Sequence, residues 1–382
     1  MARGNGESIE QALRLAGDVA GIAQTAMEIQ QIPAPTFGEQ ERAAEVQRRF
    51  QALGLAEVAQ DGIGNVYGRR PGSTDRPGLL LAAHLDTVFP SGTDLSVRRD
   101  GARIYGPGIG DNSLGVAALL HLAAILRQAR APNSIDTWFV ADVGEEGMGD
   151  LRGMRAAVDK LALRIGSAIA IEGFGFGRIY HRAIAVRRLR VAVHAPGGHS
   201  WADYGSPSAI HRLVMIAAEL AKLPVPEKPR STLNIGTFQG GTSVNTIAEA
   251  AHLLLDLRSE DQATLEQMER SVRAAIDRVG VPAGTTVTVE VVGSRDGGAI
   301  PATHPLAQAA ATALRETGQA VDWGSGSTDA NVPLARGIPA ICIGITTGAN
   351  AHRLDEYIEL TDLPRGMEAL VRLVWSLTCE AA

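Results

Sequence analysis

Acidic and histidine side chains follow apolar runs at five places along this chain, and each place is rich in glycine or other small residues. Carboxylates and imidazoles are side chains that bind divalent metal ions readily. One such group after an apolar run is ordinary, but five together predict a site for two divalent ions that activate water. The residues are His84 and Asp86 in LLLAAHLDTVFP, Asp111 in GPGIGDNSLG, Glu145 and Glu146 in VADVGEEGMGD, Glu172 in AIAIEGFGFG, and His352 in GANAHRLDEYIEL.

The spacing of the first of these residues indicates how they work together. His84 and Asp86 are two positions apart, so on an extended backbone both side chains point to the same side. A metal-binding imidazole usually donates its second N–H to a carboxylate, and Asp86 is placed for that task. Asp111 lies among glycines, and its two oxygens can each bind one ion. It could instead cap the following helix, although Asn112 or Ser113 could serve as the cap and leave Asp111 facing the metals.

Glu145 and Glu146 are adjacent carboxylates after an apolar run. Neighbouring residues outside a helix project in different directions, so one can bind metal while the other holds the water. A general base for hydrolysis needs a raised pKa and hydrogen-bond reach to that water. Glu172 is a candidate ligand of one ion and His352 of the other. His199, in APGGHSWADYGSP, lies in a glycine turn suited to contact a ligand, although a turn before a helix has the same composition.

Length and composition limit the class of protein. A chain of 382 residues is longer than one core usually requires, so we expect about two domains. The net charge of -6 argues against a nucleic-acid-binding surface. No apolar stretch reaches about 18 residues, which predicts no membrane span. The N-terminus lacks the apolar segment of a signal peptide, and Cys342 and Cys379 form no disulfide framework, so we expect a cytoplasmic protein.

The order of apolar segments predicts an α/β fold. LLLAAHLDTV, DTWFVADVGEE and SAIAIEGFG are apolar enough to be buried strands, and helical segments separate them, which is typical of a mostly parallel sheet. Near residue 184 the strands begin to alternate apolar and polar residues, in the order β-α-β-β-α-β, and after residue 301 the first pattern resumes. We therefore expect a discontinuous α/β domain (1–183 and 296–382) that contains an inserted α+β sandwich (184–295).

The same pattern predicts helices in both domains. Because parallel strands end at one edge of a sheet, the polar groups that follow them should meet there. The expected helices span residues 8–32, 41–53, 113–130, 208–222, 261–279, 306–317 and 363–378.

These motifs resemble those of the M20 metallopeptidases, the family that contains carboxypeptidase G, acetylornithine deacetylase, succinyl-diaminopimelate desuccinylase and peptidase T. The resemblance covers essentially the whole chain, and the motifs occur in the order found in the family. They are HLDTV from His84, GxGxxDxxxG from Gly106 to Gly115, GEEG from Gly144 to Gly147, GGHSW, and GGTSVNTIAEAA followed by DLRS.

The resemblance implies a hydrolase of amide or peptide bonds with two divalent ions. Zinc is the first candidate for these ions, although cobalt and manganese suit the same ligands. The resemblance also implies a catalytic role for two further acids. Glu145 would be the general base, and Asp86 would orient His84. The implied ligands are His84 and Glu172 for one ion, Glu146 and His352 for the other, and Asp111 between the two.

The same resemblance gives the inserted domain a purpose. In the family this domain mediates dimerisation, and the histidine of GGHS reaches the partner's active site, where it polarises the scissile carbonyl; here that residue is His199. Asn245 and Arg258 match positions that hold substrate carboxylate or carbonyl groups, and Ser327 and Thr328 lie in a substrate-contacting loop. A homodimer that acts on small peptides or N-acyl amino acids is the expected assembly.

The substrate stays open at this stage. Glutamate at position 172 favours the carboxypeptidase G and deacylase groups, whereas the segments HLDTVFP and GEEGMGDLRG resemble those of peptidase T-like members. Aminopeptidase, carboxypeptidase and deacylase activities all fit, as does a dedicated deacylase or amidohydrolase of a non-peptide metabolite. A non-catalytic binding relative should have lost a ligand or the base, and all of these residues are present.

Overall fold

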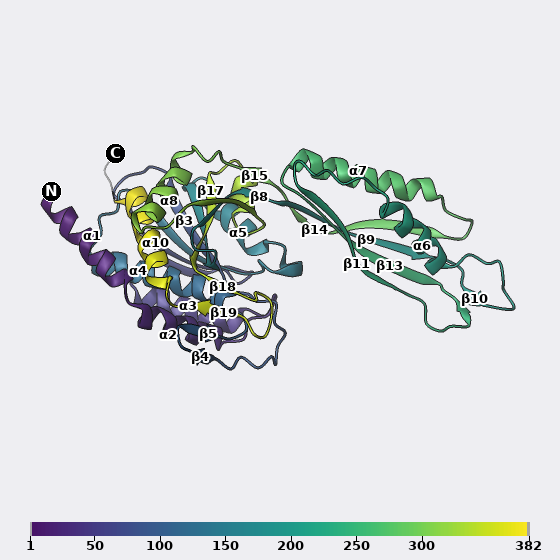
Figure 1. Ribbon diagram of the computed structural model, residues 1–382, viewed down its shortest axis with the longest axis horizontal. Coiled ribbons are helices and arrows are strands. Elements are labelled where there is room, and N and C mark those ends of the chain that lie inside the picture. The colour runs from purple at the N-terminus through teal and green to yellow at the C-terminus, as the bar shows by residue number, and fades with distance from the viewer. Residues whose placement is uncertain (1, 380–382) are drawn as a thin grey trace. The chain divides into compact units, whose positions relative to one another are not determined.

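The computed structural model describes residues 2–379, which form two compact units (Figure 1). The first unit contains the chain up to Ala183 and again from Ala299 onward. The second unit is the segment Ile184–Gly298 between them. The first unit is therefore built from two separate stretches of chain, and His352 belongs to the same unit as His84.

A nine-stranded sheet forms the centre of the first unit, with the order β1-β2-β6-β3-β7-β17-β8-β15 and with β16 paired to β8. Strand β3 runs parallel to β6 and β7, β7 runs parallel to β17, and β16 runs parallel to β8. The expected α/β class with a mainly parallel sheet is confirmed. The strands are β1 Ala56–Gln60, β2 Val66–Arg70, β3 Gly78–His84, β6 Thr137–Asp142, β7 Ile165–Phe174, β8 Arg178–Ala183, β15 Gly298–Ala299, β16 Asp322–Gly326 and β17 Ala340–Thr346.

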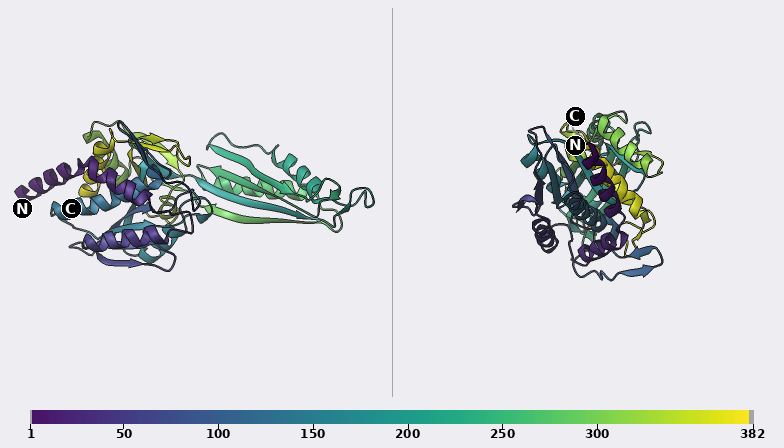
Figure 2. Two further views of the ribbon diagram at one scale, coloured as in Figure 1. Left: turned by 90° about the horizontal axis from the view of Figure 1, so that it is seen from below. Right: turned by 90° about the vertical axis from the view of Figure 1, so that its left-hand side faces the viewer.

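The central strands are apolar without alternation because both of their faces are covered. Every residue of β3, β6 and β17 is buried, and helices flank this sheet in both views of Figure 2. Apolar residues on both faces are typical of parallel strands with helices on either side. Cys342 in β17 is buried and forms no disulfide, as expected for a small apolar side chain.

The N-terminal helical segment differs from expectation. Residues 8–32 were expected to form one helix, but the structure has α1 (Ala2–Ala16) and α2 (Val19–Gln30). The Asp18 carboxylate accepts a hydrogen bond of 2.9 Å from the Gly21 N–H and caps α2. The apolar periodicity continues across the break because both helices bury one side, so periodicity alone does not locate the cap.

The other expected helices are confirmed to within two residues at each end. A helix was expected between β6 and β7 without limits, and it is α5; the short α9 was not predicted. The helices are α3 Gln40–Ala52, α4 Gly115–Gln128, α5 Arg152–Leu161, α6 Ala209–Leu220, α7 Gln262–Val279, α8 Pro305–Glu316, α9 Asn331–Ala335 and α10 Leu363–Thr378.

Helix α4 lies in the core. Together with the turn before it, the segment Ile109–Gln128 is, among residues 2–379, the one helix with the length and apolar composition to cross a membrane. The structure buries 83% of its most apolar window. The segment packs against α2, β3 and β7, so its apolar character is explained by a position inside the first unit.

A small sheet in the first unit joins the two stretches of chain, with the order β18-β19-β5-β4. Its strands β19 and β5 pair Tyr357 with Tyr105, and the two rings lie 5.2 Å apart between centroids. The hairpin between β18 and β19 carries His352. The strands are β4 Arg98–Asp100, β5 Arg103–Tyr105, β18 Gly348–Ala349 and β19 Tyr357–Glu359.

The second unit is an antiparallel sheet, in the order β11-β13-β9-β14, with helices α6 and α7 packed against it (Figure 1). Apolar residues three or four positions apart line the buried side of each helix and meet alternate residues of β9 and β13. The strands are β9 Ala185–His194, β10 Gly198–His199, β11 Ser231–Gly240, β12 Thr246–Ile247, β13 Ala250–Ser259 and β14 Thr286–Arg295.

Candidate metal centre

The first unit brings the five predicted metal ligands together in two groups of three. In each group the candidate ligand atoms all lie within 4.8 Å of one another. Asp111 belongs to both groups. The first group is His84, Asp111 and Glu172, and the second is Asp111, Glu146 and His352.

The two oxygens of Asp111 face different imidazoles. Oδ1 lies 3.2 Å from Nε2 of His84, and Oδ2 lies 3.1 Å from Nε2 of His352. Each imidazole nitrogen also faces a second carboxylate: Glu172 Oε2 is 3.6 Å from His84, and Glu146 Oε1 is 3.0 Å from His352. A carboxylate with one oxygen in each of two donor groups is arranged to bridge two cations.

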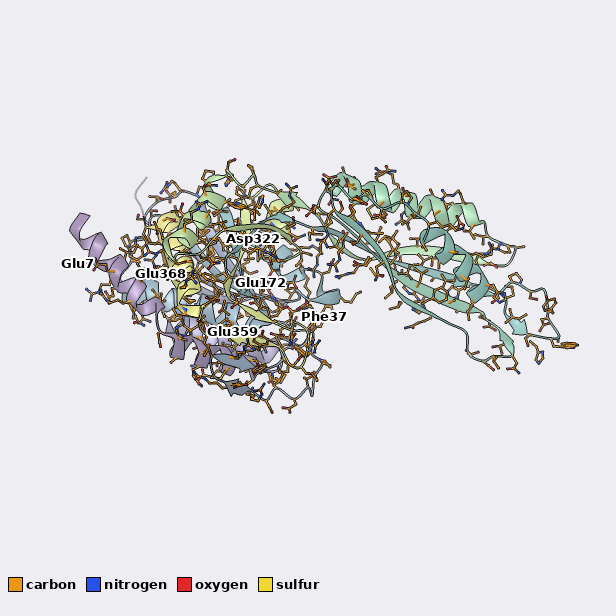
Figure 3. The ribbon with its side chains drawn as sticks, in the orientation of Figure 1. Glu7, Phe37, Glu172, Asp322, Glu359 and Glu368 are labelled. Atoms are coloured by element: carbon orange, nitrogen blue, oxygen red, sulfur yellow. The ribbon has the colours of Figure 1, made fainter. Side chains whose placement is uncertain are left out.

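Three of these groups lie at or near the ends of strands. His84 is the last residue of β3, and Glu146 follows β6. Glu172 was expected in a loop, but β7 continues for two residues beyond it, to Phe174 (Figure 3 labels Glu172).

The Phe174 ring packs directly on Gly110 and leaves no space for a side chain there, because a Cβ added at Gly110 would lie 2.1 Å from that ring. Glycine is therefore required there for close packing between β7 and the Asp111 loop.

His352 lies in the hairpin between β18 and β19 with a left-handed backbone. Its φ is 66°, and that of Asn350 in the same hairpin is 64°. A non-glycine residue in this region costs about 1–3 kcal/mol and persists only where the surroundings enforce it. The bonds that His352 makes to Asp111 and Glu146 are part of that enforcement.

Asp86 supports the site mainly through the backbone of the Glu145–Glu146 turn. Its Oδ1 and Oδ2 accept the N–H groups of Glu145 and Glu146, each at 2.9 Å, and Oδ2 also accepts the Thr36 hydroxyl at 2.9 Å. Nδ1 of His84 lies 3.0 Å from the backbone carbonyl of Asp86 and 3.5 Å from its Oδ1. The nearer contact assigns the Nδ1 proton to the carbonyl, which leaves Nε2 unprotonated for a metal when the ring is neutral.

Asn112 has a different role from the expected helix cap. Helix α4 begins without a side-chain cap, so the cap predicted at Asn112 or Ser113 is wrong. The Asn112 side chain instead donates to the Ile171 carbonyl at 2.9 Å and accepts from the Gly173 N–H at 3.0 Å. These two bonds lie on either side of Glu172 and tie its strand to the residue after Asp111.

Glu356 is a buried residue of the site that sequence reasoning missed. Its carboxylate accepts backbone N–H groups from Gly108 at 3.2 Å, from Gly110 at 2.8 Å and from Asp111 at 2.9 Å. Burial raises the pKa of Glu356 to about 7 in spite of these bonds. The available signal was alternation, since Glu356 is two residues before the buried Ile358 and shares its face of the strand.

Asp142 and Asp329, a second pair of acids that the sequence did not single out, lie beside the centre. Asp142 ends β6 directly opposite His84, and burial raises its pKa to about 7. Burial also raises the pKa of Asp329 well above its ordinary range, and the charge of Asp142 adds to that effect. Near neutral pH the pair therefore carries less negative charge than two solvated carboxylates.

The two imidazoles hold protons where no cation is present. Burial by itself would lower the pKa of His84, but the nearby carboxylates of Glu172 and Asp111 raise it well above its usual value. Hydrogen bonds to Asp111 and Glu146 raise the pKa of His352 to about 10. Three carboxylates that draw protons onto two imidazoles form a donor set with an excess of negative charge, and this set fits divalent cations.

Metal binding should therefore release protons. His84 and His352 must be neutral to donate an electron pair to a metal, and the raised pKa values of both rings favour their protonated forms in the metal-free chain. We expect about two protons to leave per chain as two ions bind, with an affinity that rises with pH. Calorimetric titration of zinc in buffers of different ionisation enthalpy measures this number, and release of no protons would contradict the described charge state.

The predicted substrate residues of the first unit lie in the loop after β16. Ser327 and Thr328 are half-buried there. The Thr328 N–H donates to the Asn331 side chain at 3.0 Å, and its hydroxyl accepts from the Ala330 N–H at 3.3 Å. These bonds hold the loop against the start of α9. Thr328 directly precedes Asp329 in this loop.

In the second unit two of the predicted residues meet and one does not. His199 and Asn245 lie in adjacent segments, because the Ser200 N–H donates to the Asn245 carbonyl at 3.0 Å. Arg258 is near the other end of β13, opposite Val186, whereas Ala250 begins that strand. The eight steps from residue 250 to residue 258 span roughly 27 Å at a strand rise of about 3.4 Å per residue.

Comparison with known proteins identifies the family. Residues 80–376 match the sequence model of Peptidase family M20/M25/M40. The chain belongs to this family. Its curated relatives include the uncharacterised protein YqjE of Bacillus subtilis, 23% identical over 91% of this chain and 96% of the relative. A succinyl-diaminopimelate desuccinylase of Corynebacterium glutamicum is 26% identical over 90% of this chain and 92% of the relative.

Solved structures of M20 peptidases share the fold. Aminopeptidase PepT from Bacillus cereus matches with a TM-score of 0.77 and 23% identity, over 95% of this chain and 99% of that one. A tripeptidase from Staphylococcus aureus matches with a TM-score of 0.79 and 21% identity, over 94% and 98%. As an M20 family member, the chain is a metal-dependent hydrolase that acts on amide bonds.

Proposed function

We propose that this M20 hydrolase cleaves an amide or peptide bond in small peptides or N-acyl amino acids, with two divalent ions, zinc first, as its cofactors. The observation that carries the proposal is that Asp111 directs one oxygen to each of two imidazoles. His84, Asp111 and Glu172 would hold one ion, and Asp111, Glu146 and His352 the other. Bound ions of this kind lower the pKa of water and polarise a carbonyl.

Glu145 is the proposed general base. Its backbone N–H is fixed by Asp86, and the residue is 7% exposed, next to the proposed ligand Glu146. In the reaction the water oxygen forms a bond to the substrate carbonyl carbon while Glu145 takes the water proton. When the C–N bond breaks, Glu145 returns that proton to the leaving nitrogen, so acid and amine products balance the water consumed.

His199 is proposed to polarise the scissile carbonyl in the active site of a partner subunit within a homodimer. Its Nδ1 accepts the N–H groups of Trp201 at 3.2 Å and Ala202 at 3.3 Å. The neutral ring therefore carries its proton on Nε2. Because His199 is exposed, this N–H is accessible as a donor to a carbonyl oxygen.

The alanine variant of His199 tests this role. His199→Ala should reduce kcat by about 10²–10³-fold, the usual effect of losing one donor to the developing oxyanion, and should leave metal content unchanged. His211→Ala, at an exposed histidine of α6, is the matched control. Steady-state kinetics combined with light scattering measures the effect, and either a wild-type rate or a monomeric active enzyme would contradict the proposal.

Substrate recognition is assigned to groups that bind carboxylates and carbonyls. Asn245 and Arg258 are proposed to hold these groups of the substrate, with Ser327 and Thr328 lining the same site. Arg258 keeps 43% of its side chain exposed beside Asp256, so it remains accessible to an anion. Because Asn245 and Arg258 lie at opposite ends of the second unit, we propose that a dimer supplies them to one site from different subunits.

A substrate panel tests the proposed activity. Metal-depleted protein, restored with zinc, cobalt or manganese, would be assayed on dipeptides, tripeptides and N-acyl amino acids that include an N-succinyl member. We expect hydrolysis of at least one class, loss of it with a chelator, and recovery on metal addition. Cleavage of N-acyl amino acids alone would identify a deacylase, as the desuccinylase relative suggests. Absence of hydrolysis across the panel with both ions bound would overturn the proposed substrate class.

A further inference from the structure

Glu356 connects the two loops that carry Asp111 and His352. It stands directly before β19, and its backbone carbonyl accepts the Gly106 N–H at 2.9 Å, which extends the pairing of β19 with β5 by one step. Its carboxylate then accepts the N–H groups of Gly108, Gly110 and Asp111. One residue of the His352 hairpin thus binds four backbone N–H groups of the segment that ends at Asp111.

These bonds leave Asp111 little freedom. Glu356 is fully buried, so water does not compete for these hydrogen bonds and they are stronger than in solvent. The Gly108 backbone has a φ of 71°, a left-handed conformation that glycine adopts without strain. The N–H groups of Gly108, Gly110 and Asp111 all turn toward a single carboxylate, which fixes the loop around it.

The hairpin also fixes the distance between two proposed ligands. His352 is four residues before Glu356, and its Nε2 lies 3.1 Å from Asp111 Oδ2. Asp111 is therefore held from its backbone side by Glu356 and meets His352 with its carboxylate. A shift of the hairpin would move both contacts together.

We infer that Glu356 is a positioning residue that sets Asp111 between the two cation positions and couples both positions to the β18–β19 hairpin. The inference rests on the proposed two-ion function. Asp111 is the residue common to both donor groups, so a defect at Glu356 lowers the affinity for both ions. A residue that served one cation position would affect one ion.

The test is Glu356→Gln in the full chain, with zinc affinity measured by competition against a chromophoric chelator. Glutamine keeps one acceptor oxygen but presents an NH₂ group to a backbone N–H, so one bond becomes a donor facing a donor. We expect both dissociation constants to rise about 10–100-fold, the usual effect of losing an outer hydrogen-bond partner of a metal ligand. The visible absorption bands of cobalt bound to the variant should also shift.

Asp136→Asn is the matched control. Asp136 also accepts a backbone N–H, that of Gly72 at 2.9 Å, but it precedes β6 at the end of the strand opposite Asp142. This variant should lower the thermal midpoint of the metal-free protein and leave both zinc affinities at the wild-type value. If Glu356→Gln fails to fold, Glu356→Asp withdraws the carboxyl group by one methylene, keeps both of its oxygens, and should weaken both ions to a smaller extent.

The outcomes separate two kinds of failure. If wild-type protein binds fewer than two zinc ions, the proposed two-ion function is wrong. If wild-type protein binds two and Glu356→Gln binds both with unchanged affinity, only the positioning role is wrong, whatever its thermal midpoint. Weakening of a single ion would also overturn the coupling of the two positions.

Discussion

Replacing Glu145 by glutamine is expected to lower kcat by about 10²–10⁴-fold, the contribution typical of general acid–base catalysis. Glutamine has nearly the same shape but cannot take a proton from water or return it to the leaving nitrogen. The backbone N–H of residue 145 still reaches Asp86, so the turn should keep its conformation. Metal analysis of the purified variant should therefore find the wild-type content.

The neighbouring carboxylate provides the control. Glu146→Gln is expected to lose affinity for one ion, since Glu146 lies 3.0 Å from His352 and, among residues 2–379, belongs to one of the two donor groups. The two adjacent substitutions should thus give opposite results: turnover lost with metal retained, and metal lost. Normal turnover in Glu145→Gln would remove Glu145 from the role of base and require another proton acceptor.

Substitution of Asp111 by asparagine is expected to lower the affinity for both ions at once. The loss should exceed about 100-fold, the largest effect usual for a residue that only hydrogen-bonds to a metal ligand. In the wild-type protein each of the two Asp111 oxygens faces a different imidazole. The asparagine amide has one oxygen, so it can face one of them. The substitution also removes a negative charge between two cation positions. Chelator competition should show two weakened sites, with activity reduced at limiting metal and partly restored by excess zinc.

Glu172→Gln is the comparison for Asp111→Asn. Among the described residues Glu172 belongs to one of the two donor groups, and its Oε2 lies 3.6 Å from His84, so one site should weaken while the other keeps its affinity. Ligand binding stabilises a folded protein in proportion to the logarithm of metal concentration over the dissociation constant. The thermal shift on zinc addition should therefore fall most in Asp111→Asn. An equal effect of both substitutions would show that Asp111 does not serve two ions.

Residue type and position in the sequence were sufficient to select the five candidate ligands. His84 and Glu146 could be selected because buried parallel strands end at one edge of a sheet, where following polar groups converge. His352 is separated from Asp111 by 241 residues, and only its glycine-framed context and the family resemblance pointed to it. Its contact with Asp111 depends on the pairing of β19 with β5, which local sequence does not specify.

The supporting residues could not be predicted in the same way. Glu356 and Asn112 act through bonds to backbone groups: alternation with Ile358 could indicate that Glu356 is buried, but residue type does not show which backbone groups either side chain binds. Asn112 was assigned to a helix cap because its local sequence fits one, whereas the tertiary contact to β7 determines its side-chain position. The single helix expected over 8–32 failed for a related reason, since a cap at Asp18 interrupts a continuous apolar face.

The central claim is that two cations share Asp111 in an amide hydrolase. Its most direct test is the hydrolysis rate of metal-depleted protein during stepwise addition of zinc. A hydrolysed member of the substrate panel, at protein concentrations far above the dissociation constants, serves as the reporter. Activity should be absent without metal and should stop rising at two ions per chain. A rate that survives complete removal of metal, or that saturates at one ion per chain, would contradict this account.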